Sequence, residues 1–278
     1  MKTTKKWVLA ILAALTVLAL AACSNAANSD GQAGGAANTD PLNGGAFVIG
    51  LDNAFPPYGF IGDDGELTGF DVDLAKMVAE ENGWDIKLEA INWDSKDALI
   101  ESEAISAIWN GFTMEGREDN YTFSKPYMVN RQVIAVKADS DIKSMKDLAG
   151  KTIITQADST ADNLFKNEQK ELAASFASIE TIGDFTQAFL QLDAGTADAV
   201  ACDLTIFDFQ NAKQNGYRVL DEGLSDDEHF AVGFKKGNEA LADAVNETLV
   251  ELDKQGKIEE LINKYAQYGM NYERWVLE

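Results

Sequence analysis

Polar residues stand directly after several apolar, strand-forming stretches of this sequence. Ligands of open α/β sheets bind beyond the carboxyl ends of the strands, so a functional site is expected at these positions. Aromatic residues occur near the same strand ends, which is typical of a small-molecule pocket with apolar walls and a few polar groups. The candidates at the strand ends are Asp52, Asn110, Gly111, Thr113, Ser159, Thr160 and Asp203, and the aromatic candidates are Phe55, Tyr58 and Trp93.

Arg117 is the candidate with the most specific chemistry. It lies four residues after Thr113 and is one of four arginines in a chain that has 19 lysines. A planar guanidinium can bind a carboxylate through two parallel hydrogen bonds, which a lysine ammonium cannot do. The alternative is a surface arginine paired with Glu115 or Glu118, and such pairs contribute only about 0–1 kcal/mol. The residues alone leave both interpretations open.

Several other candidates also have a purely structural interpretation. Ser159 and Asp158 can cap the helix that follows them, and Asp203 can cap the next one. Phe55 and Trp93 suit a hydrophobic core as well as a binding pocket. Capping is compatible with ligand contact, so the spacing does not decide between these roles.

The sequence does not indicate catalytic or metal chemistry. It contains no Ser-His-Asp arrangement, metal-ligand spacing or phosphate-binding loop, so no metal and no cofactor are expected. His229 is the only histidine and is expected at the surface or in a hinge, while Cys202 suits a small buried position. The formal net charge of −23 argues against nucleic acid, which binds basic surfaces.

The amino terminus has the pattern of an export signal. Three lysines in MKTTKK precede an apolar run from Trp7 to Ala22, which is shorter than the roughly 20 residues that span a bilayer. The ending LAAC resembles a bacterial lipoprotein signal, in which the cysteine is lipidated. We therefore expect residues 1–22 to be a signal peptide and Cys23 to carry a lipid that anchors the protein to the membrane.

Residues 23–45 are expected to form a flexible tether. Apart from Leu42 they contain no large apolar side chain, so they cannot bury a core. From Ala46 onward, stretches typical of strands and helices alternate in two successive βαβαβ runs. At 278 residues the chain is long enough for two modest units, and this rhythm predicts two α/β lobes.

Five segments occur in order between residues 46 and 267: IGLDNAFPPYGF, LTGFDVDLAKMVAEENG, WNGFTMEGRE, YTFSKPYMVNRQVIAV and GTADAVACD. Together they resemble the extracellular solute-binding proteins of polar amino-acid ABC importers, solute-binding protein family 3. The resemblance implies the type II periplasmic-binding-protein fold, in which two α/β lobes joined by two hinge strands close over a ligand. It also implies a first lobe of residues 46–130 and 228–278 and a second lobe of residues 131–227.

The resemblance assigns roles to the residues that match the family's motifs. Arg117 would bind the ligand's α-carboxylate, with help from Thr113 and from the backbone at Ser159 and Thr160. Asp203 would take the α-ammonium group, with the Gly111 carbonyl nearby. The side chain of the ligand would meet Asp52, Phe55 and Trp93. Apart from the resemblance, Gln156 is a further candidate for that contact, and Asn110 is a candidate as a polar residue at a strand end.

The ligand's side chain is less well defined by the sequence. Asp158 stands where the family often has glycine, and it adds negative charge near the cleft. Together with Asp52 it favours a ligand that bears a hydrogen-bond donor or a positive charge, such as glutamine or arginine. The segment WNGFTMEGRED, apart from Glu115, is also similar to the matching segment of cystine-binding proteins, so cystine is a further candidate ligand.

The leading hypothesis is a monomeric, lipid-anchored protein that captures an amino acid outside the cell and delivers it to the permease subunits of an ABC transporter. Such a protein catalyses no reaction. Two other classes remain as alternatives: an enzyme such as a dehydratase, since this fold also hosts one, and a ligand sensor. No signalling domain is attached, which counts against the sensor.

Overall fold

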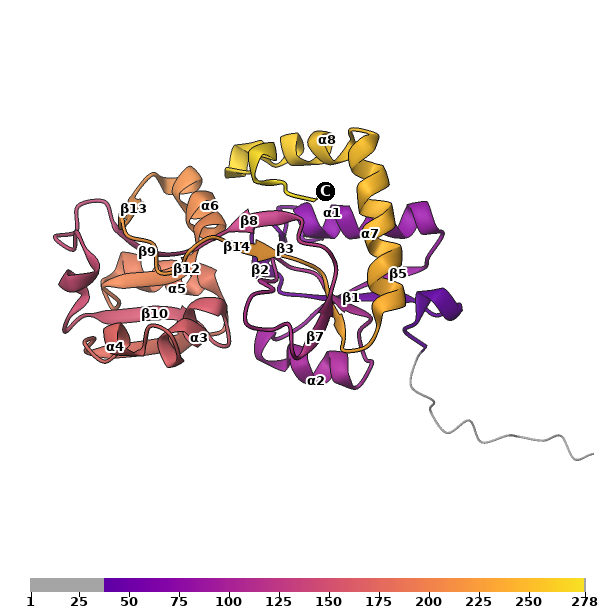
Figure 1. The fold of residues 1–278 in the computed structure, drawn as a ribbon. Helices are drawn as coiled ribbons and strands as arrows, with labels where there is room; N and C mark the ends of the chain where they lie inside the picture. The colour runs from indigo at the N-terminus through magenta and orange to yellow at the C-terminus, as the bar shows by residue number, and fades with distance from the viewer. Residues whose placement is uncertain (1–37, 278) are drawn as a thin grey trace, which may run out of the picture. The chain divides into compact units, whose positions relative to one another are not determined.

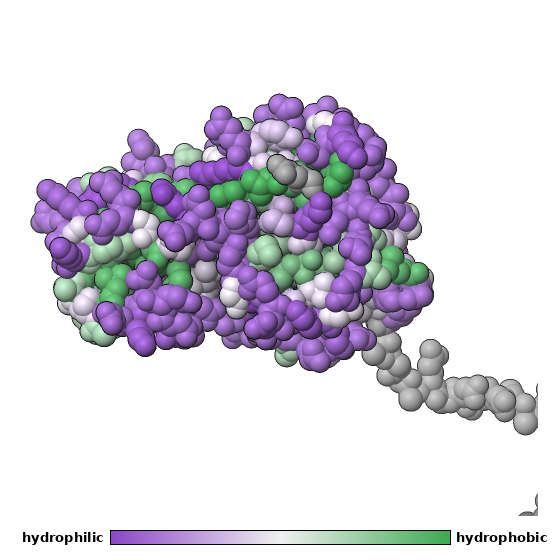
Figure 2. All heavy atoms as spheres, in the orientation of Figure 1, coloured by the Kyte–Doolittle hydropathy of each residue, from purple (hydrophilic) through white to green (hydrophobic). Residues whose placement is uncertain are grey.

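The computed structural model describes residues 38–277, which form a mixed α/β protein built on two five-stranded sheets (Figure 1). The expected signal peptide at residues 1–22, Cys23 and the first part of the expected tether lie outside the described residues. Between residues 38 and 277, no helix is long and apolar enough to cross a membrane. The face drawn in Figure 2 is largely hydrophilic, with only short hydrophobic stretches.

The first lobe is built on one of these sheets. Its strands, in order across the sheet, are β5 (Ile86–Ala90), β1 (Phe47–Leu51), β6 (Ala107–Ile108), β15 (Gly233–Lys235) and β7 (Tyr121–Phe123). β1 pairs parallel with β5 and β6, whereas β15 pairs antiparallel with β6 and β7. All five residues of β1 are buried, because helices cover both faces of such a sheet. A small sheet beside it contains β2 (Ala54–Phe55), β3 (Gly59–Ile61) and β4 (Leu67–Thr68).

The second lobe is built on the other sheet. Its strands, in order, are β11 (Ser178–Ile182), β10 (Thr152–Gln156), β12 (Ala199–Asp203), β9 (Gln132–Lys137) and β13 (Tyr217–Val219). β10 pairs parallel with β11 and β12, while β9 runs antiparallel to β12 and β13. In both lobes the predicted site residues follow the carboxyl ends of parallel strands.

The helices cover these sheets. The α-helices are α1 (Phe70–Asn82), α2 (Lys96–Glu101), α3 (Thr160–Lys166), α4 (Lys170–Ala173), α5 (Phe185–Ala194), α6 (Leu204–Gln214), α7 (Glu239–Lys254) and α8 (Lys257–Lys264). The 3₁₀ helices are η1 (Pro41–Asn43), η2 (Trp93–Ser95), η3 (Met145–Leu148), η4 (Ala266–Tyr268) and η5 (Tyr272–Arg274). α7 and α8 contact α1 and so belong to the first lobe, while η4 contacts α6 of the second.

α5 shows how the sequence pattern produces these elements. Asp184 caps its start by accepting a hydrogen bond from the Gln187 backbone, and Gly195 ends it with a φ of 73°, which glycine adopts at little cost. The apolar residues at helical spacing are all buried, as predicted: Phe185, Ala188, Phe189 and Leu192. One hydrophobic cluster continues from this helix into the first lobe, where the ring centroids of Phe55 and Phe185 lie 6.0 Å apart.

Two antiparallel strands connect the lobes: β8 (Met128–Asn130) and β14 (Glu228–Phe230), the hinge strands. Asn130 pairs with Glu228 in this ladder, so polar side chains from both strands stand at the junction of the lobes. Figure 1 shows α6 and the carboxyl-terminal helices on one side of the hinge strands and α2 and α3 on the other.

The structure differs from the sequence prediction in three places. Residues 38–45, expected within a flexible tether, are held on the first lobe, because Ser106 donates to the Thr39 carbonyl and Thr39 donates to the Glu103 carbonyl. The helix expected after Ser159 ends as α3 at Lys166, and the short α4 follows it; Asn167 between them has a φ of −123° and a ψ of −94°, which are not helical. The small sheet of β2, β3 and β4 was not predicted.

Candidate functional site

A narrow cavity of about 10 Å³ lies between the lobes, beyond the carboxyl ends of β6, β10 and β12, so the lobes must separate to admit a ligand larger than water. The first lobe lines it with Phe55, Trp93, Gly111, Phe112, Thr113 and Arg117, and the second lobe with Gln156, Ser159, Thr160 and Asp203. The structure thus brings together all the predicted site residues except Asp52, Tyr58 and Asn110, which are buried and do not line the cavity.

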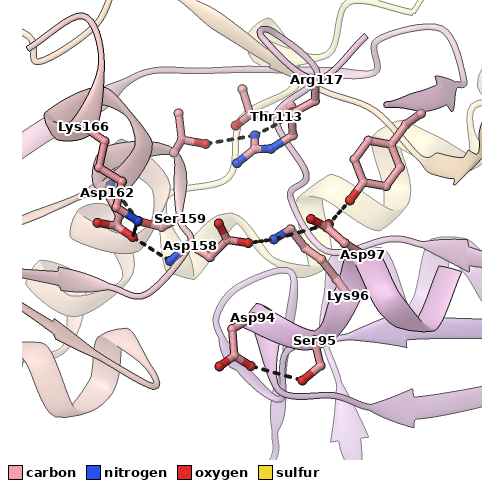
Figure 3. Close-up of polar contacts among 12 residues, drawn as sticks. Asp94, Ser95, Lys96, Asp97, Thr113, Arg117, Asp158, Ser159, Asp162 and Lys166 are labelled. Carbon is pink, nitrogen blue, oxygen red and sulfur yellow. Dashed lines mark hydrogen bonds and ion pairs between the residues drawn. The ribbon is translucent and has the colours of Figure 1, made fainter. Parts of the chain in front are cut away.

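The Arg117 guanidinium spans the two lobes at this cavity. Its Nη1 donates to the Thr113 carbonyl at 2.8 Å and to Thr160 Oγ1 of the second lobe at 3.3 Å (Figure 3). Its Cζ lies 5.0 Å from the centroid of the Phe112 ring, which supports the cation from one face. Because both hydrogen bonds come from Nη1, the geometry leaves Nη2 and Nε of this side chain for a planar anion.

The surface alternative for Arg117 does not describe its environment. Glu115 pairs with His229 instead, with 2.7 Å between Oε1 and the imidazole Nδ1. Among residues 38–277, no carboxylate forms an ion pair with Arg117. Burial lowers the pKa of Arg117, while the charges of Glu228 and other acids oppose that shift.

Asp203 is held by side chains of the connecting segment. It stands at the N-cap position of α6, but its side chain makes no capping hydrogen bond. Its Oδ1 instead accepts hydrogen bonds from Asn130 Nδ2 and Gln132 Nε2, both at 2.7 Å. The helix-cap interpretation was therefore wrong, and this buried carboxylate faces the cavity.

Glu228 shares the same donors. Its Oε1 accepts from Asn130 Nδ2 and Gln132 Nε2, each at 2.7 Å, and from Thr113 Oγ1 at 3.0 Å. Burial raises the pKa of Asp203 to about 7, and the charge of Glu228 adds to that effect. Burial also raises the pKa of Glu228, so neither carboxyl group ionises as easily as it would in water.

Asp52 and Gln156 connect the lobes at another point. Asp52 Oδ2 accepts from Gln156 Nε2 at 2.5 Å, and its Oδ1 accepts from the Ala54 backbone N–H at 2.8 Å. Gln156 Nε2 also donates to the Gly183 carbonyl at 2.9 Å. Burial raises the pKa of Asp52, and these hydrogen bonds oppose the rise. Asp52 thus orients Gln156, which does line the cavity.

Gly111 occupies a position that only glycine fits well. Its φ is 55°, and an added Cβ would lie 2.7 Å from the Phe55 ring. Its N–H donates at 2.6 Å to Asp71, a carboxyl group whose pKa burial raises to about 7. Asn110, the preceding residue, is buried, and its Oδ1 lies close to Gly59. It does not line the cavity.

Aromatic rings and a helix cap form the remaining wall. Trp93 stacks edge-on against Phe112, with centroids 5.6 Å apart at 85°. Ser159 caps α3 by accepting from the Asp162 backbone N–H at 3.2 Å, so its capping role holds while it also borders the cavity. The walls therefore combine three aromatic side chains, the third being Phe55, with one cation and one carboxylate.

A second hollow of about 310 Å³ lies outside this cavity and shares Arg117 and Thr160 with it. Lys96 from α2 and Asp158 from the second lobe form an ion pair across the hollow (Figure 3). Lys96 is only 2% exposed, whereas the side chain of Asp158 is 37% exposed. The negative charge that Asp158 was expected to add to the cleft is thus matched by Lys96, and it gives no preference for a cationic ligand.

Sequence reasoning missed five residues of this site. Phe112 lines the cavity, Lys96 closes the outer cleft, and Asn130, Gln132 and Glu228 hold Asp203. The spacing of Asn130 and Gln132 carried a signal, because residues two apart in an extended chain face the same side. Lys96 carried no such signal, since its partner lies in the other lobe.

Two lobes joined by two strands, with a closed cavity between them, define a ligand-binding protein of the type II two-lobed class. Among the described residues, no group of histidine, cysteine and acidic side chains is placed to hold a metal ion. The family model of the bacterial extracellular solute-binding proteins, family 3, matches residues 47–268. The chain belongs to that family.

Individual relatives agree with this assignment. The L-cystine-binding protein TcyJ of Escherichia coli is 31% identical over 227 residues, covering 80% of this chain and 82% of the relative. A glutamine-binding protein of Geobacillus stearothermophilus is 31% identical over 251 residues, covering 84% and 93%. Both are named as binding proteins, which supports the expectation of a binding protein over an enzyme.

A solved structure has the same fold. It is the substrate-binding protein of an ABC uptake transporter from Streptococcus pneumoniae with bound histidine, with a TM-score of 0.76 and 33% identity. The match covers 79% of this chain and 92% of that one. The predicted two-lobed fold is thereby confirmed.

Proposed function

We propose that the protein captures a polar L-α-amino acid in the interlobe cavity and delivers it to the membrane subunits of an ABC importer. The observation that carries the proposal is the placement of Arg117 and Asp203 on the walls of one small cavity. An amino acid at neutral pH is a zwitterion, and it needs an anion-binding and a cation-binding group at short separation. Relatives named for cystine and glutamine binding support the same class of ligand.

Each end of the zwitterion has a suitable partner. The unoccupied guanidinium nitrogens of Arg117 match a carboxylate in planarity and charge, and Thr160 lies beside them. Asp203 supplies the negative charge for the ammonium group, with the Gly111 backbone on the same wall. Thr113 acts indirectly in this arrangement, because its hydroxyl donates to Glu228.

The side chain of the ligand would lie against Phe55, Trp93 and Gln156. Gln156 offers an amide held by Asp52, so the pocket suits a side chain with its own hydrogen-bonding group. Glutamine, a basic amino acid and cystine all meet that description. With Asp158 neutralised by Lys96, Asp52 is the acid that would favour a donor or a positive charge.

Delivery would take place at the outer surface of the cell membrane. The family consists of extracellular proteins. We propose that Cys23 carries the lipid that holds this one near its importer, on the basis of the LAAC ending. Replacing Cys23 with alanine should release the protein from the membrane fraction, and unchanged partitioning would contradict the anchor.

The test of ligand capture is calorimetry on Arg117→Ala. A thermal-shift screen of the twenty amino acids and cystine first selects the ligand, because binding at 100-fold the Kd adds about 2.7 kcal/mol of stability. Arg117→Ala should then lose about 2–5 kcal/mol of binding free energy, roughly thirty-fold to several thousand-fold in Kd, since it leaves a buried carboxylate unpaired. Arg117→Lys should recover only part of that loss.

Two controls make the result specific. Lys87→Ala on the exposed side of β5 removes a cation far from the cavity and should leave Kd unchanged. The carboxamide of the selected amino acid should bind wild type weakly, and Arg117→Ala should lose most of that discrimination. Binding of the amino acid by Arg117→Ala within a few-fold of wild type contradicts the carboxylate assignment.

A further inference from the structure

Asp203 and Glu228 form a buried carboxyl pair at the hinge. One oxygen of each group accepts hydrogen bonds from the same two nitrogens, Asn130 Nδ2 and Gln132 Nε2, and all four distances are 2.7 Å. The two oxygens therefore lie no farther apart than twice that length. Both side chains are 4% exposed, so water does little to screen one charge from the other.

The two residues of the pair differ in their access to the cavity. Asp203 lines the wall, whereas Glu228 stands behind it and also accepts a hydrogen bond from Thr113. The two residues come from different elements, since Asp203 ends β12 of the second lobe and Glu228 begins hinge strand β14. A change at Glu228 therefore acts on a ligand through Asp203.

The cations near Asp203 and Glu228 do not fully compensate the negative charge of the two carboxyl groups. Arg117 is the cation that faces the pair, and that guanidinium is also the proposed partner of the ligand's carboxylate. Tyr58 interacts with Asp203 and also with the cation Arg274. Arg274 and Arg131 act on Asp208 of α6. Arg117 interacts with both carboxyl groups of the pair, and a single guanidinium balances only one of their two charges.

We propose that Glu228 makes ligand capture proton-linked: in the empty site Asp203 and Glu228 hold one proton between them, and the ligand's ammonium group displaces it. The proposal rests on the proposed function and adds its regulation. No bond other than O–H changes, and the proton passes to solvent as the ammonium charge replaces it. Like charges held this close titrate as a pair, with the first proton lost easily and the second retained.

The direction of the pH effect follows from linkage. Burial and the charge of Glu228 raise the pKa of Asp203 to about 7 in the empty site, and a bound ammonium lowers the pKa of the pair. At pH values below that pKa, binding must release a proton. Affinity should therefore fall by about tenfold for each unit of pH below about 7 and become constant above it.

Two other ionisable groups near the site are alternatives to the pair. His229 follows Glu228 in the hinge strand and pairs with Glu115. Asp71 lies beneath Gly111, and its raised pKa of about 7 arises from burial. The experiment must separate these groups from the pair.

The test is calorimetry of the selected amino acid in buffers of different ionisation enthalpy, which counts the protons released. Wild type should release close to one proton at about pH 6 and close to none above about pH 8. Glu228→Gln should still bind but release almost none, with a Kd that changes by less than about twofold over that range. His229→Gln should keep the wild-type release.

Each outcome decides a separate question. Release that persists in Glu228→Gln, or disappears in His229→Gln, overturns the proposal. Should Glu228→Gln fail to fold, the wild-type series still decides, because a Kd independent of pH with no proton released also overturns it. A wild-type protein that binds no amino acid at any pH refutes the proposed function instead.

Discussion

The two lobes touch each other on both sides of the hinge strands, and the two sets of contacts differ in chemistry. On the side of the cavity, the cleft contacts are mainly polar: Asp52 with Gln156, Lys96 with Asp158, and Arg117 with Thr160, beside one aromatic contact of Phe55 with Phe185. On the side of α6 and η4, the rear contacts are mainly aromatic: Phe209 with Phe60 and Tyr268, beside the ion pair of Arg274 with Asp208. Figure 1 shows α6 and α8 on one side of β8 and β14, and α2 and α3 on the other.

This difference indicates that the contacts on the two sides of the hinge strands have different functions. Polar groups lose little when they separate, because water replaces the lost partner, so cleft contacts can open to admit a ligand. Apolar contacts are costly to expose, since burial of each Å² of apolar area contributes about 25 cal/mol. We infer that the rear contacts persist through opening and act as a pivot. Substitutions in the rear contacts should then lower the free energy of unfolding, and substitutions in the cleft contacts should lower the affinity for the ligand.

The largest expected effect is that of Phe209→Ala on stability. Phe209 is 2% exposed, and its ring centroid lies 5.0 Å from that of Tyr268 and 5.7 Å from that of Phe60. Truncating a buried phenylalanine costs about 3–5 kcal/mol, so the midpoint of denaturant unfolding should fall sharply. Ligand affinity, measured by calorimetry, should change little.

Phe165→Ala is the matched control. It removes a buried ring of the second lobe that packs on Phe176, away from both sets of contacts. Both variants should lose stability and keep their affinity. A loss of affinity in Phe209→Ala that matches its loss of stability would mean that the rear contacts form only when the lobes close.

Asp158→Asn should have an intermediate effect, on affinity. The substitution removes the charge that faces Lys96 in the closed cleft, and asparagine tolerates the φ of 58° found there. A hydrogen bond to a charged group contributes about 1.5–3 kcal/mol, and the partial exposure of Asp158 reduces this to roughly 1–2 kcal/mol. Kd should therefore rise about five-fold to thirty-fold, with little change in the unfolding of the ligand-free protein.

Asp97→Asn provides the comparison for that variant. Asp97 lies 3.8 Å from the same Lys96 ammonium, but its side chain is 70% exposed. Its effect on Kd should be below about 1 kcal/mol. Equal effects from the two variants would show that the cleft senses general charge rather than the contact between the lobes. High salt should narrow the difference between Asp158→Asn and wild type.

Many residues of the cleft could be predicted from the sequence, but the contacts between the lobes that close it could not. Arg117, Ser159 and Asp203 follow strand ends within their own segments, and their position is a local property of the chain. Lys96 and Asp158 are 62 residues apart, and their pairing exists only because two lobes meet. Before the fold is known, Lys96 looks like a solvated residue, and Asp158 looks like a helix cap or a charge near the cleft.

The sequence predicted a position for the hinge but not the side-chain hydrogen bonds within it. The resemblance placed the lobe boundaries at residues 130–131 and 227–228; in the structure β8 ends at Asn130 and β14 begins at Glu228. The sharing of two amide donors between Asp203 and Glu228 depends on the register that sets Glu228 opposite Asn130. No pattern within a single strand contains that register.

The smallest expected effect is that of Arg274→Ala on the rear side. Arg274 Nη2 lies 2.9 Å from Asp208 Oδ2, and both side chains are about one-quarter exposed. Because the pair is partly hydrated, its loss should cost about 1 kcal/mol of unfolding free energy and leave Kd unchanged. Burial raises the pKa of Asp208, and Arg274 opposes that rise by stabilising the ionised form. The cost of Arg274→Ala should thus be present at neutral pH and disappear as acid protonates Asp208. The double variant Arg274→Ala, Asp208→Asn should recover most of the loss, since it leaves no unpaired charge. An affinity change in Arg274→Ala larger than that in Asp158→Asn would reverse the roles assigned to the two sides of the hinge.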